Sequence, residues 1–201
     1  ILSAVAALRG DGFQPAGDVW LGFVTDEEYL SIGMDALVQQ VRADAAILTE
    51  PTGLHICTAH KGFAWLTLTT YGTSAHGSLY EVGVDAVAHM GRVLNALERL
   101  NTVIFPRRDH PLLGRPSAHG SLIRGGLGWS TYPDRCTLQV EHRLLPDETA
   151  ADVIELWERL LGGLSAADPQ FKAEVKLDFT RPGYEIERDA PVVGALHQAH
   201  L

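Results

Sequence analysis

The sequence predicts an α/β protein in which part of a parallel-sheet domain carries an inserted ferredoxin-like domain of order βαββαβ. The first third holds short, largely apolar runs on either side of a helical pattern. From about residue 63, candidate strands instead alternate apolar and polar residues, as half-exposed antiparallel strands do. Two amphipathic helices interrupt those strands in the order that a split βαβ arrangement requires.

The first third is typical of a βαβ unit. The apolar runs "DVWLGFV" (18–24) and "DAAILT" (44–49) are expected to be strands covered on both faces. Between them, "MDALVQQVRA" (34–43) has its apolar residues at helical spacing. A strand, a helix and a strand of this length predict a right-handed parallel unit, with Trp20 in its core.

The remainder predicts an antiparallel sheet with helices on one face. In "RCTLQVEHRLL", Cys136, Leu138 and Val140 face one way, whereas Glu141 and Arg143 face the other. The predicted strands lie at 63–72, near 119–125, at 135–145 and at 171–179. The predicted helices lie at 82–100 and 149–164, the second opened by a capping box from Thr149 to Asp152. The other face of the sheet should therefore stay open and polar.

The pattern changes near residues 58–62, and an "RPG" turn follows at 181–183. These changes predict three segments: 1–60 in the α/β domain, 61–181 as the inserted domain, and 182–201 as a return to the first domain. The chain starts without Met and stops inside an apparent helix, so we expect a piece of a longer protein. A cleaved signal peptide stays open as an alternative.

Composition excludes several classes of function. A net charge of −9 argues against nucleic-acid binding, because no basic stripe is present to neutralise phosphates. No apolar run approaches the roughly 20 residues of a membrane helix. The two cysteines, Cys57 and Cys136, form no disulfide framework and are expected to be small core residues. Such usage suits a reducing compartment, and we expect a cytoplasmic protein.

Carboxylates follow both apolar runs of the first third. Asp26, Glu27 and Glu28 come after one run and Glu50 after the other. The carboxyl ends of parallel strands meet at one edge of a sheet, and clustered carboxylates repel one another unless a cation lies among them. A divalent metal site is one interpretation. The other is that "DEE" is a solvated first helical turn, where acids suit the macrodipole, and that Glu50 is a loop acid.

Four stretches occur in this order: "TDEEYLSIG", "ILTEPTG", "HKGFAWLTLTTYGTSAHGS…GVDAVAHMGRVLNALERL" and "GGLGWSTYPDRCTLQVEHRLLP". Together they resemble the dinuclear zinc amidohydrolases and peptidases, the family of acetylornithine deacetylase, succinyl-diaminopimelate desuccinylase, aminoacylase and glutamate carboxypeptidase. The likeness covers nearly the whole chain. It implies a zinc-hydrolase catalytic domain with the ferredoxin-like segment as its lid and dimerisation domain.

The resemblance also implies roles for the acids. Glu27 matches the general base, Glu28 a ligand of one zinc ion and Glu50 a ligand of the other. Two Zn2+ ions per complete active site are implied, with Co2+ or Mn2+ as alternatives. The family's His-x-Asp motif, bridging Asp and C-terminal His cannot be placed here, since no His precedes Asp26. The fragment alone is therefore expected to be inactive.

Three further residues lie in the inserted domain. His76 matches a histidine that reaches into the partner subunit's active site and stabilises the oxyanion there. Arg143 matches the arginine that binds the substrate's carboxylate, which suits its planar guanidinium fork. Ser130 is a substrate-binding candidate at a position where many members carry a carbonyl-binding Asn, and its hydroxyl has a single donor and a shorter reach. The plainer alternatives are an exposed His76 in a Gly/Ser turn and a surface ion pair from Arg143 to Glu141 or Asp147.

The function implied is metal-dependent hydrolysis of an amide bond in an N-acyl amino acid or small peptide-like substrate, by a homodimer that pairs through the lid domain. The activity would be of the deacylase, deacetylase, desuccinylase or carboxypeptidase type. The alternative is a non-catalytic dimerisation or binding module derived from this family. Most of the other histidines are expected at the surface, Trp65 in the core, and Trp129 beside the substrate cleft.

Overall fold

Alternating apolar and polar residues build a four-stranded antiparallel sheet in the second of two compact units, which comprise Ile1–Glu50 and Pro51–Leu201. The computed structural model describes residues 1–200. The segment boundaries expected at residues 60 and 181 stay predictions.

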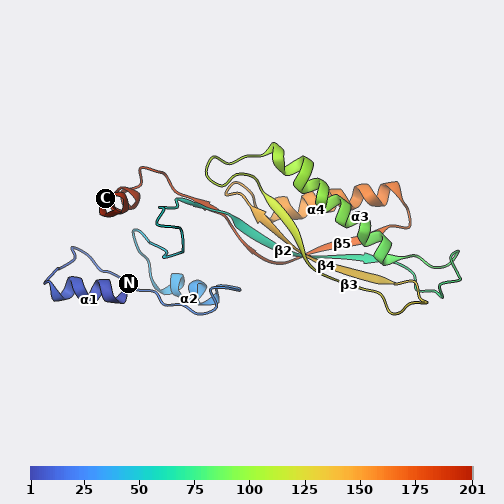
Figure 1. Cartoon of the computed structure of the whole chain (residues 1–201), viewed down its shortest axis with the longest axis horizontal. Coiled ribbons are helices and arrows are strands. Elements are labelled where there is room, and N and C mark those ends of the chain that lie inside the picture. The colour runs from blue at the N-terminus through green and yellow to red at the C-terminus, as the bar shows by residue number, and fades with distance from the viewer. Residues whose placement is uncertain (201) are drawn as a thin grey trace. The chain divides into compact units, whose positions relative to one another are not determined.

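The larger unit contains the predicted βαββαβ order (Figure 1). Its elements are β2 (Gly62–Tyr71), α3 (Ala86–Arg99), β3 (Ser117–Gly125), β4 (Arg135–Leu144), α4 (Ala150–Ala167) and β5 (Lys172–Arg181). Helix α3 continues into a π-helical turn at Leu100–Ile104 and a 3-10 turn at Phe105–Arg107. A two-stranded ribbon of β1 (Ala59–His60) and β6 (Tyr184–Glu185) and helix α5 (Pro191–His200) complete this unit.

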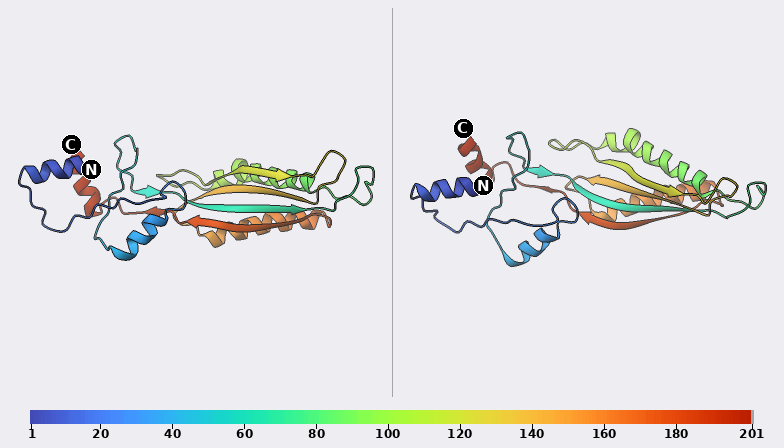
Figure 2. Two further views of the ribbon diagram at one scale, coloured as in Figure 1. Left: turned by 90° about the horizontal axis from the view of Figure 1, so that it is seen from below. Right: turned by 60° about the horizontal axis from the view of Figure 1, so that its bottom comes forward.

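The strand order β3-β4-β2-β5 is that of a ferredoxin-like sheet, with every neighbouring pair antiparallel. Helices α3 and α4 lie on one face of the sheet, and no other described helix or strand of this unit covers the second face, which we call the open face (Figures 1 and 2). The central strand β2 pairs with β4 from Gly62↔Leu144 to Tyr71↔Arg135. The ladder between β2 and β5 is interrupted by a bulge between Trp65 and Leu66.

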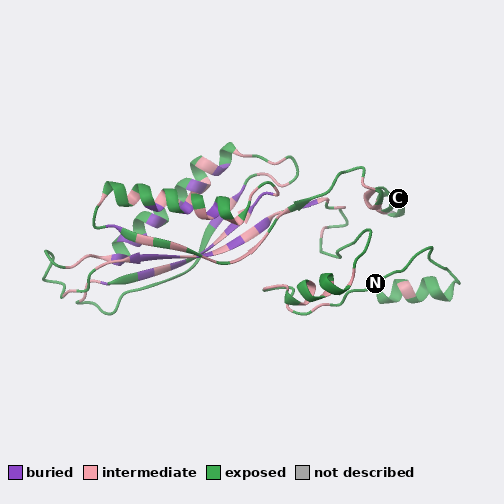
Figure 3. Cartoon of the chain, turned by 180° about the vertical axis from the view of Figure 1, so that it is seen from behind, coloured by how far each residue is buried: buried purple, intermediate pink, exposed green. Residues whose placement is uncertain are grey.

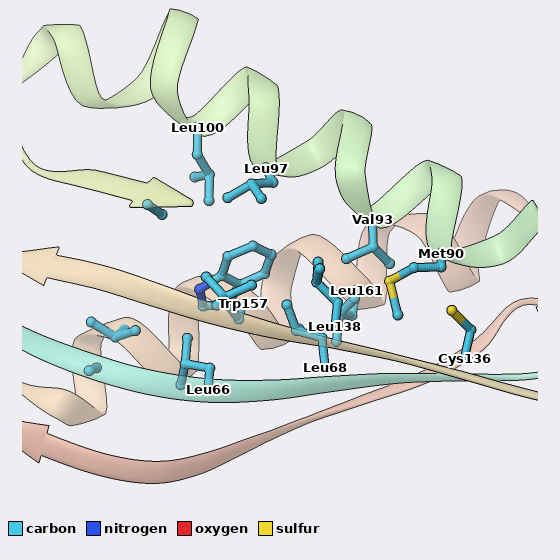
Figure 4. Close-up of a cluster of buried hydrophobic side chains, with 14 of the residues drawn as sticks. Leu66, Leu68, Met90, Val93, Leu97, Leu100, Cys136, Leu138, Trp157 and Leu161 are labelled. Carbon is cyan, nitrogen blue, oxygen red and sulfur yellow. The ribbon is translucent and has the colours of Figure 1, made fainter. Parts of the chain in front are cut away.

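The core lies between the sheet and the two helices (Figure 4). Its members alternate along β2 and β4 and recur at helical spacing on α3 and α4; they include Leu66, Leu68, Leu138, Met90, Val93, Leu97, Trp157 and Leu161. Burying one such aliphatic side chain stabilises the fold by about 1.5–3 kcal/mol. The sequence-based prediction of two amphipathic helices over one sheet face is therefore confirmed.

Both helices carry N-terminal caps formed by side chains. Asp85 accepts hydrogen bonds from the backbone N–H groups of Val87 (2.8 Å) and Ala88 (3.0 Å) at the start of α3. Thr149 and Asp152 form the predicted capping box at the start of α4. These caps satisfy amide donors that the first turn of a helix leaves unpaired.

His89 and His142 are exceptions to the expectation that most histidines lie at the surface, because they are 4% and 1% exposed. His89 Nδ1 lies 3.0 Å from the carbonyl oxygen of Tyr71. By contrast, neither ring nitrogen of His142 has a hydrogen-bond partner among the described residues. Its ring packs against Phe105 at a centroid distance of 5.1 Å. Burial lowers the pKa of His142 to about 4, because the charged form loses its hydration.

The unit of residues 1–50 contains α1 (Leu2–Gly10) and α2 (Ile32–Gln40), but the parallel strands expected at 18–24 and 44–49 are not formed. No side chain of this unit is fully buried (Figure 3). Trp20, expected in the core, is 67% exposed. An apolar run becomes a strand only where another strand pairs with its backbone and other elements cover its faces. The described residues provide neither for these runs.

Every helix among the described residues is too short or too polar to span a lipid bilayer. Cys136 is buried in the sheet core as expected, whereas Cys57 is exposed.

Candidate active site

The acidic stretch forms a tight turn just ahead of α2 rather than its first helical turn. Asp26 and Ser31 both adopt left-handed backbone conformations, with φ of 60° and 57°. The N–H of Ser31 donates to the Asp26 carbonyl (2.7 Å), and the N–H of Leu30 donates to the Asp26 carboxylate (3.3 Å). The side chains of Glu27 and Glu28 are exposed. Asp26 is therefore occupied in shaping the turn, which presents the two glutamates to solvent.

The described residues do not by themselves assemble a metal site. No group of three or more His, Cys, Asp or Glu side chains among them could hold a metal ion. Protein zinc sites take three or four protein ligands. Glu50, predicted to converge with the acidic turn, is exposed, and the strand pairing that would have aligned it is not formed. Glu28 and Glu50 as metal ligands stay predictions.

His76 and Ser130, which lie 54 positions apart in the sequence, are brought together by the backbone. His76 pairs with Thr131 in an isolated bridge, and the N–H of Gly77 donates to the Ser130 carbonyl (2.7 Å). The N–H of Tyr132 donates to the Ala75 carbonyl (2.8 Å). The loop after β2 and the loop before β4 thus lie side by side at one end of the sheet (Figure 1).

The hydrogen bonds of His76 define its tautomer in the neutral state. The backbone N–H of Ser78 donates to His76 Nδ1 (3.3 Å), and Ser78 Oγ lies 2.8 Å from the same nitrogen. Because an amide N–H can only donate, Nδ1 must be the unprotonated nitrogen. Nε2 therefore carries the proton. An exposed His76 with a donor at Nε2 is suited to hydrogen-bonding a carbonyl oxygen or an oxyanion.

Arg143 lies on the open face, where cross-strand pairing produces two rows of three residues. The first row is Arg143, Phe63 and Arg181, and the second is Glu141, Trp65 and Phe179. Each row runs across β4, β2 and β5 in that order. We call these six residues the aromatic–arginine patch.

Arg143 is held within this patch by two contacts. Its Nη1 donates to Glu141 Oε1 (3.3 Å), and its Cζ lies 5.6 Å from the centroid of the Phe63 ring. The other oxygen of Glu141 accepts a hydrogen bond from Trp65 Nε1 (3.1 Å). The ion pair with Glu141 is the plainer of the two interpretations of Arg143. It leaves the recognition role open, since a guanidinium has further N–H donors.

Trp65 is half-buried on the open face and not part of the core between sheet and helices, which corrects its sequence-based placement. Its ring lies 5.3 Å from that of Phe63 and 5.6 Å from that of Phe179. Sequence reasoning missed Phe63, Glu141 and Phe179 as a group with Arg143. The sequence contained only part of the information needed to predict this group. Alternation placed Glu141 and Arg143 on one face of their strand, but it did not give the register between strands.

The His76–Ser130 pair and Arg143 lie toward opposite ends of the sheet. Strand β4 begins at Arg135, shortly after Ser130, and Arg143 is near its other end. The eight residue-to-residue steps from Arg135 to Arg143 span roughly 27 Å at about 3.4 Å per step. One small substrate cannot contact both groups within a single copy of the sheet.

A hollow of about 500 Å³ near Arg108 and Pro146 contains none of the predicted site residues. Several of its charged groups are already paired: Arg108 bridges to Asp147 (2.7 Å) and to Glu148, and His110 Nε2 lies 3.1 Å from Glu185 Oε2. The hollow is therefore not the place where the predicted chemistry would occur.

The sequence profile described as "peptidase dimerisation domain" matches residues 58–169. Acetylornithine deacetylase of Myxococcus xanthus is 30% identical over 179 residues, which cover 87% of this chain and 47% of that protein. The Edwardsiella ictaluri enzyme of the same name is 31% identical over 163 residues, covering 79% and 42%. The chain therefore spans about half the length of these relatives or less.

Among solved structures, a tripeptidase from Staphylococcus aureus superposes with a TM-score of 0.55 at 16% identity. The superposition covers 71% of this chain and 35% of that one. At this level of identity the likeness concerns the fold alone.

Proposed function

The chain belongs to the amidohydrolase and peptidase family of acetylornithine deacetylase, and on that premise we propose that the complete protein hydrolyses the amide bond of an N-acyl amino acid or a related small substrate. The observation that carries the proposal is the similarity to acetylornithine deacetylases over 87% of this chain. It reaches well beyond the dimerisation domain at residues 58–169.

The proposed roles follow the chemistry of each side chain. Glu27, exposed at the tip of a hydrogen-bonded turn, would act as the general base toward the attacking water. Glu28 and Glu50 would contribute carboxylates to a metal site whose other donors the described residues do not supply. His76 would donate from Nε2 to the developing oxyanion. Arg143 would bind the substrate's carboxylate, with Ser130 near the scissile carbonyl.

The separation of His76 from Arg143 supports a homodimeric active site. The two groups lie roughly 27 Å or more apart along one sheet, which exceeds the length of an N-acyl amino acid. If both contact the same substrate, they come from two protomers. The match to a dimerisation domain supports the same arrangement.

The proposal is tested by assaying the complete protein against a panel of N-acetyl, N-succinyl and N-formyl amino acids, with release of the free amine as the readout. Metal-dependent turnover of one or more members supports it. A correctly folded dimer that turns over none of them would favour the alternative, a non-catalytic dimerisation module.

Arg143→Lys in the complete protein should raise KM for substrates with a free carboxylate by about tenfold or more, with a smaller change in kcat. The reason is that an ammonium group cannot reproduce the two parallel hydrogen bonds of a guanidinium fork. Steady-state kinetics on an N-acyl amino acid and on its C-terminal amide check the prediction. An equal loss on both compounds would mean that Arg143 acts only through its pair with Glu141.

Mixed dimers test whether His76 acts across the subunit interface. A His76→Ala protomer and a Glu27→Gln protomer should each be inactive as homodimers, yet a mixed dimer retains one site with both groups intact. Activity should therefore recover to about half of the wild-type specific activity in purified mixed dimers, and to about a quarter in a 1:1 mixture whose subunits have exchanged at random. Purified heterodimers, isolated with two different affinity tags, that stay inactive would place His76 and Glu27 on the same protomer.

A further inference from the structure

The aromatic–arginine patch contains three aromatic rings in mutual contact, which binding of a carboxylate alone does not require. Its three rings contact one another at centroid distances of 5.3, 5.6 and 5.9 Å, the last between Phe63 and Phe179. All three rings belong to half-buried residues, so their positions are restrained while part of each ring stays accessible. Two neighbouring strands hold them: Phe63 and Trp65 lie on β2, and Phe179 lies on β5 beside the bulge in their ladder. The patch is therefore a preformed apolar surface directly beside Arg143.

The charge around this surface is mainly positive. Arg143 lies over Phe63, and Arg181 lies over Phe179 with its Cζ 4.8 Å from the ring centroid. Lys61 adds a third cation near Arg143: burial first, and then the charges of Arg143 and Arg115, lower the pKa of its ammonium group. The carboxylate within the patch, that of Glu141, already accepts from Arg143 and Trp65. These cations attract a ligand that carries a carboxylate, and they repel a ligand whose side chain carries a positive charge.

Rings and charges together specify the ligand. Aromatic rings favour contact with another flat apolar group, in offset or edge-to-face geometry. Resting on the proposed function, we propose that Phe63, Trp65 and Phe179 contact the substrate's amino-acid side chain and select N-acyl amino acids with aromatic or large apolar side chains over those with cationic ones. The preferred substrate therefore differs in class from acetylornithine, whose side chain carries an ammonium group.

The test uses the complete protein with N-acetylphenylalanine, N-acetylornithine and N-acetylalanine. The wild-type protein should show a kcat/KM for N-acetylphenylalanine about tenfold or more above that for N-acetylornithine. Phe179→Leu keeps an apolar side chain but removes the ring, and should lower kcat/KM for N-acetylphenylalanine roughly 3–10-fold with little change for N-acetylalanine. Phe179→Tyr keeps the ring and should retain the preference.

Tyr71→Leu is the matched control. Tyr71 lies on the open face of the same strand β2, at its other end, where its hydroxyl donates to Glu174. Its replacement should not change the ratio of kcat/KM for N-acetylphenylalanine to kcat/KM for N-acetylornithine. Thermal unfolding of each variant shows whether it is folded, and Phe63→Leu replaces Phe179→Leu if the latter is not.

The outcomes separate this inference from the proposed function. Turnover of N-acetylornithine equal to or better than that of N-acetylphenylalanine, or equal effects of Phe179→Leu and Tyr71→Leu, would overturn the inference and leave amide hydrolysis standing. If no substrate is turned over, the proposed function fails and calorimetric binding decides the inference. Tighter binding of N-acetylphenylalanine that Phe179→Leu abolishes would support it, and equal affinities would overturn it.

Discussion

Glu27→Gln in the complete protein should lower kcat about 10²–10⁴-fold, the loss expected when a general base is removed. The substitution keeps the size and shape of the side chain. It should also keep the turn, because the turn uses the Asp26 carboxylate and the Glu27 backbone carbonyl, which accepts from Ser31 Oγ (3.2 Å), and not the Glu27 carboxylate. Steady-state kinetics together with metal analysis by atomic emission provide the measurement.

Glu28→Gln is the matched control for this experiment, since the two glutamates are adjacent and both exposed. We expect it to lower bound metal, whereas Glu27→Gln should leave the metal content unchanged. If Glu27→Gln instead loses metal and Glu28→Gln does not, the roles of the two residues are exchanged. If neither affects turnover, the acidic turn is not part of the site.

Acidification should destabilise the sheet domain through His142. An unperturbed histidine has a pKa near 6.5, as in an unfolded chain, whereas burial lowers the pKa of His142 to about 4 in the folded state. Between these values the unfolded chain binds a proton that the folded domain does not, so stability falls as pH falls from about 6.5 to about 4. The shift corresponds to about 3 kcal/mol in the free energy of unfolding. This stability is fully present above pH 6.5 and is lost as the pH falls to about 4.

Urea unfolding followed by circular dichroism between pH 4 and pH 7 checks this prediction. Carboxylates also titrate in this range, so the quantity to compare is the difference between wild type and His142→Leu. That variant should be about as stable as wild type at pH 7, because neither ring nitrogen of His142 has a partner to lose among the described residues. It should be more stable at pH 4. An exposed control, His55→Gln, should follow wild type; a parallel pH dependence of His142→Leu would contradict the assignment.

Local patterns were sufficient to predict the sheet domain. Alternation in 135–145 and helical spacing in 149–164 depend on neighbours a few positions away, and the capping box at Thr149 is local as well. The strands predicted at 18–24 and 44–49 are not formed. A strand covered on both faces depends on partner strands and helices that its own sequence does not describe. His142 continues the buried series of Cys136, Leu138 and Val140, so a longer reading of the alternation would have found it.

The candidate site was predictable only where motifs carried it. His76 and Ser130 were proposed separately, and their proximity emerged from backbone pairing between loops far apart in the sequence. The aromatic–arginine patch was not foreseen, because it depends on the register that places Phe63 opposite Arg143 and Trp65 opposite Phe179. Register follows from turn geometry and packing of the whole sheet, which no single strand encodes.

The central position of β2 also determines when the domain can be completed during synthesis. Trp65 bonds to Glu141, 76 residues later, and Thr67 bonds to Asp178, 111 residues later. At about 5–20 residues per second, the ribosome delivers the second of these partners roughly 6–22 s after the first strand. Until β5 emerges, one edge of β2 stays unpaired and Phe63 and Trp65 lack the ring of Phe179. For several seconds, the nascent chain therefore exposes an unpaired strand edge together with apolar side chains. A chaperone would bind the chain during this interval.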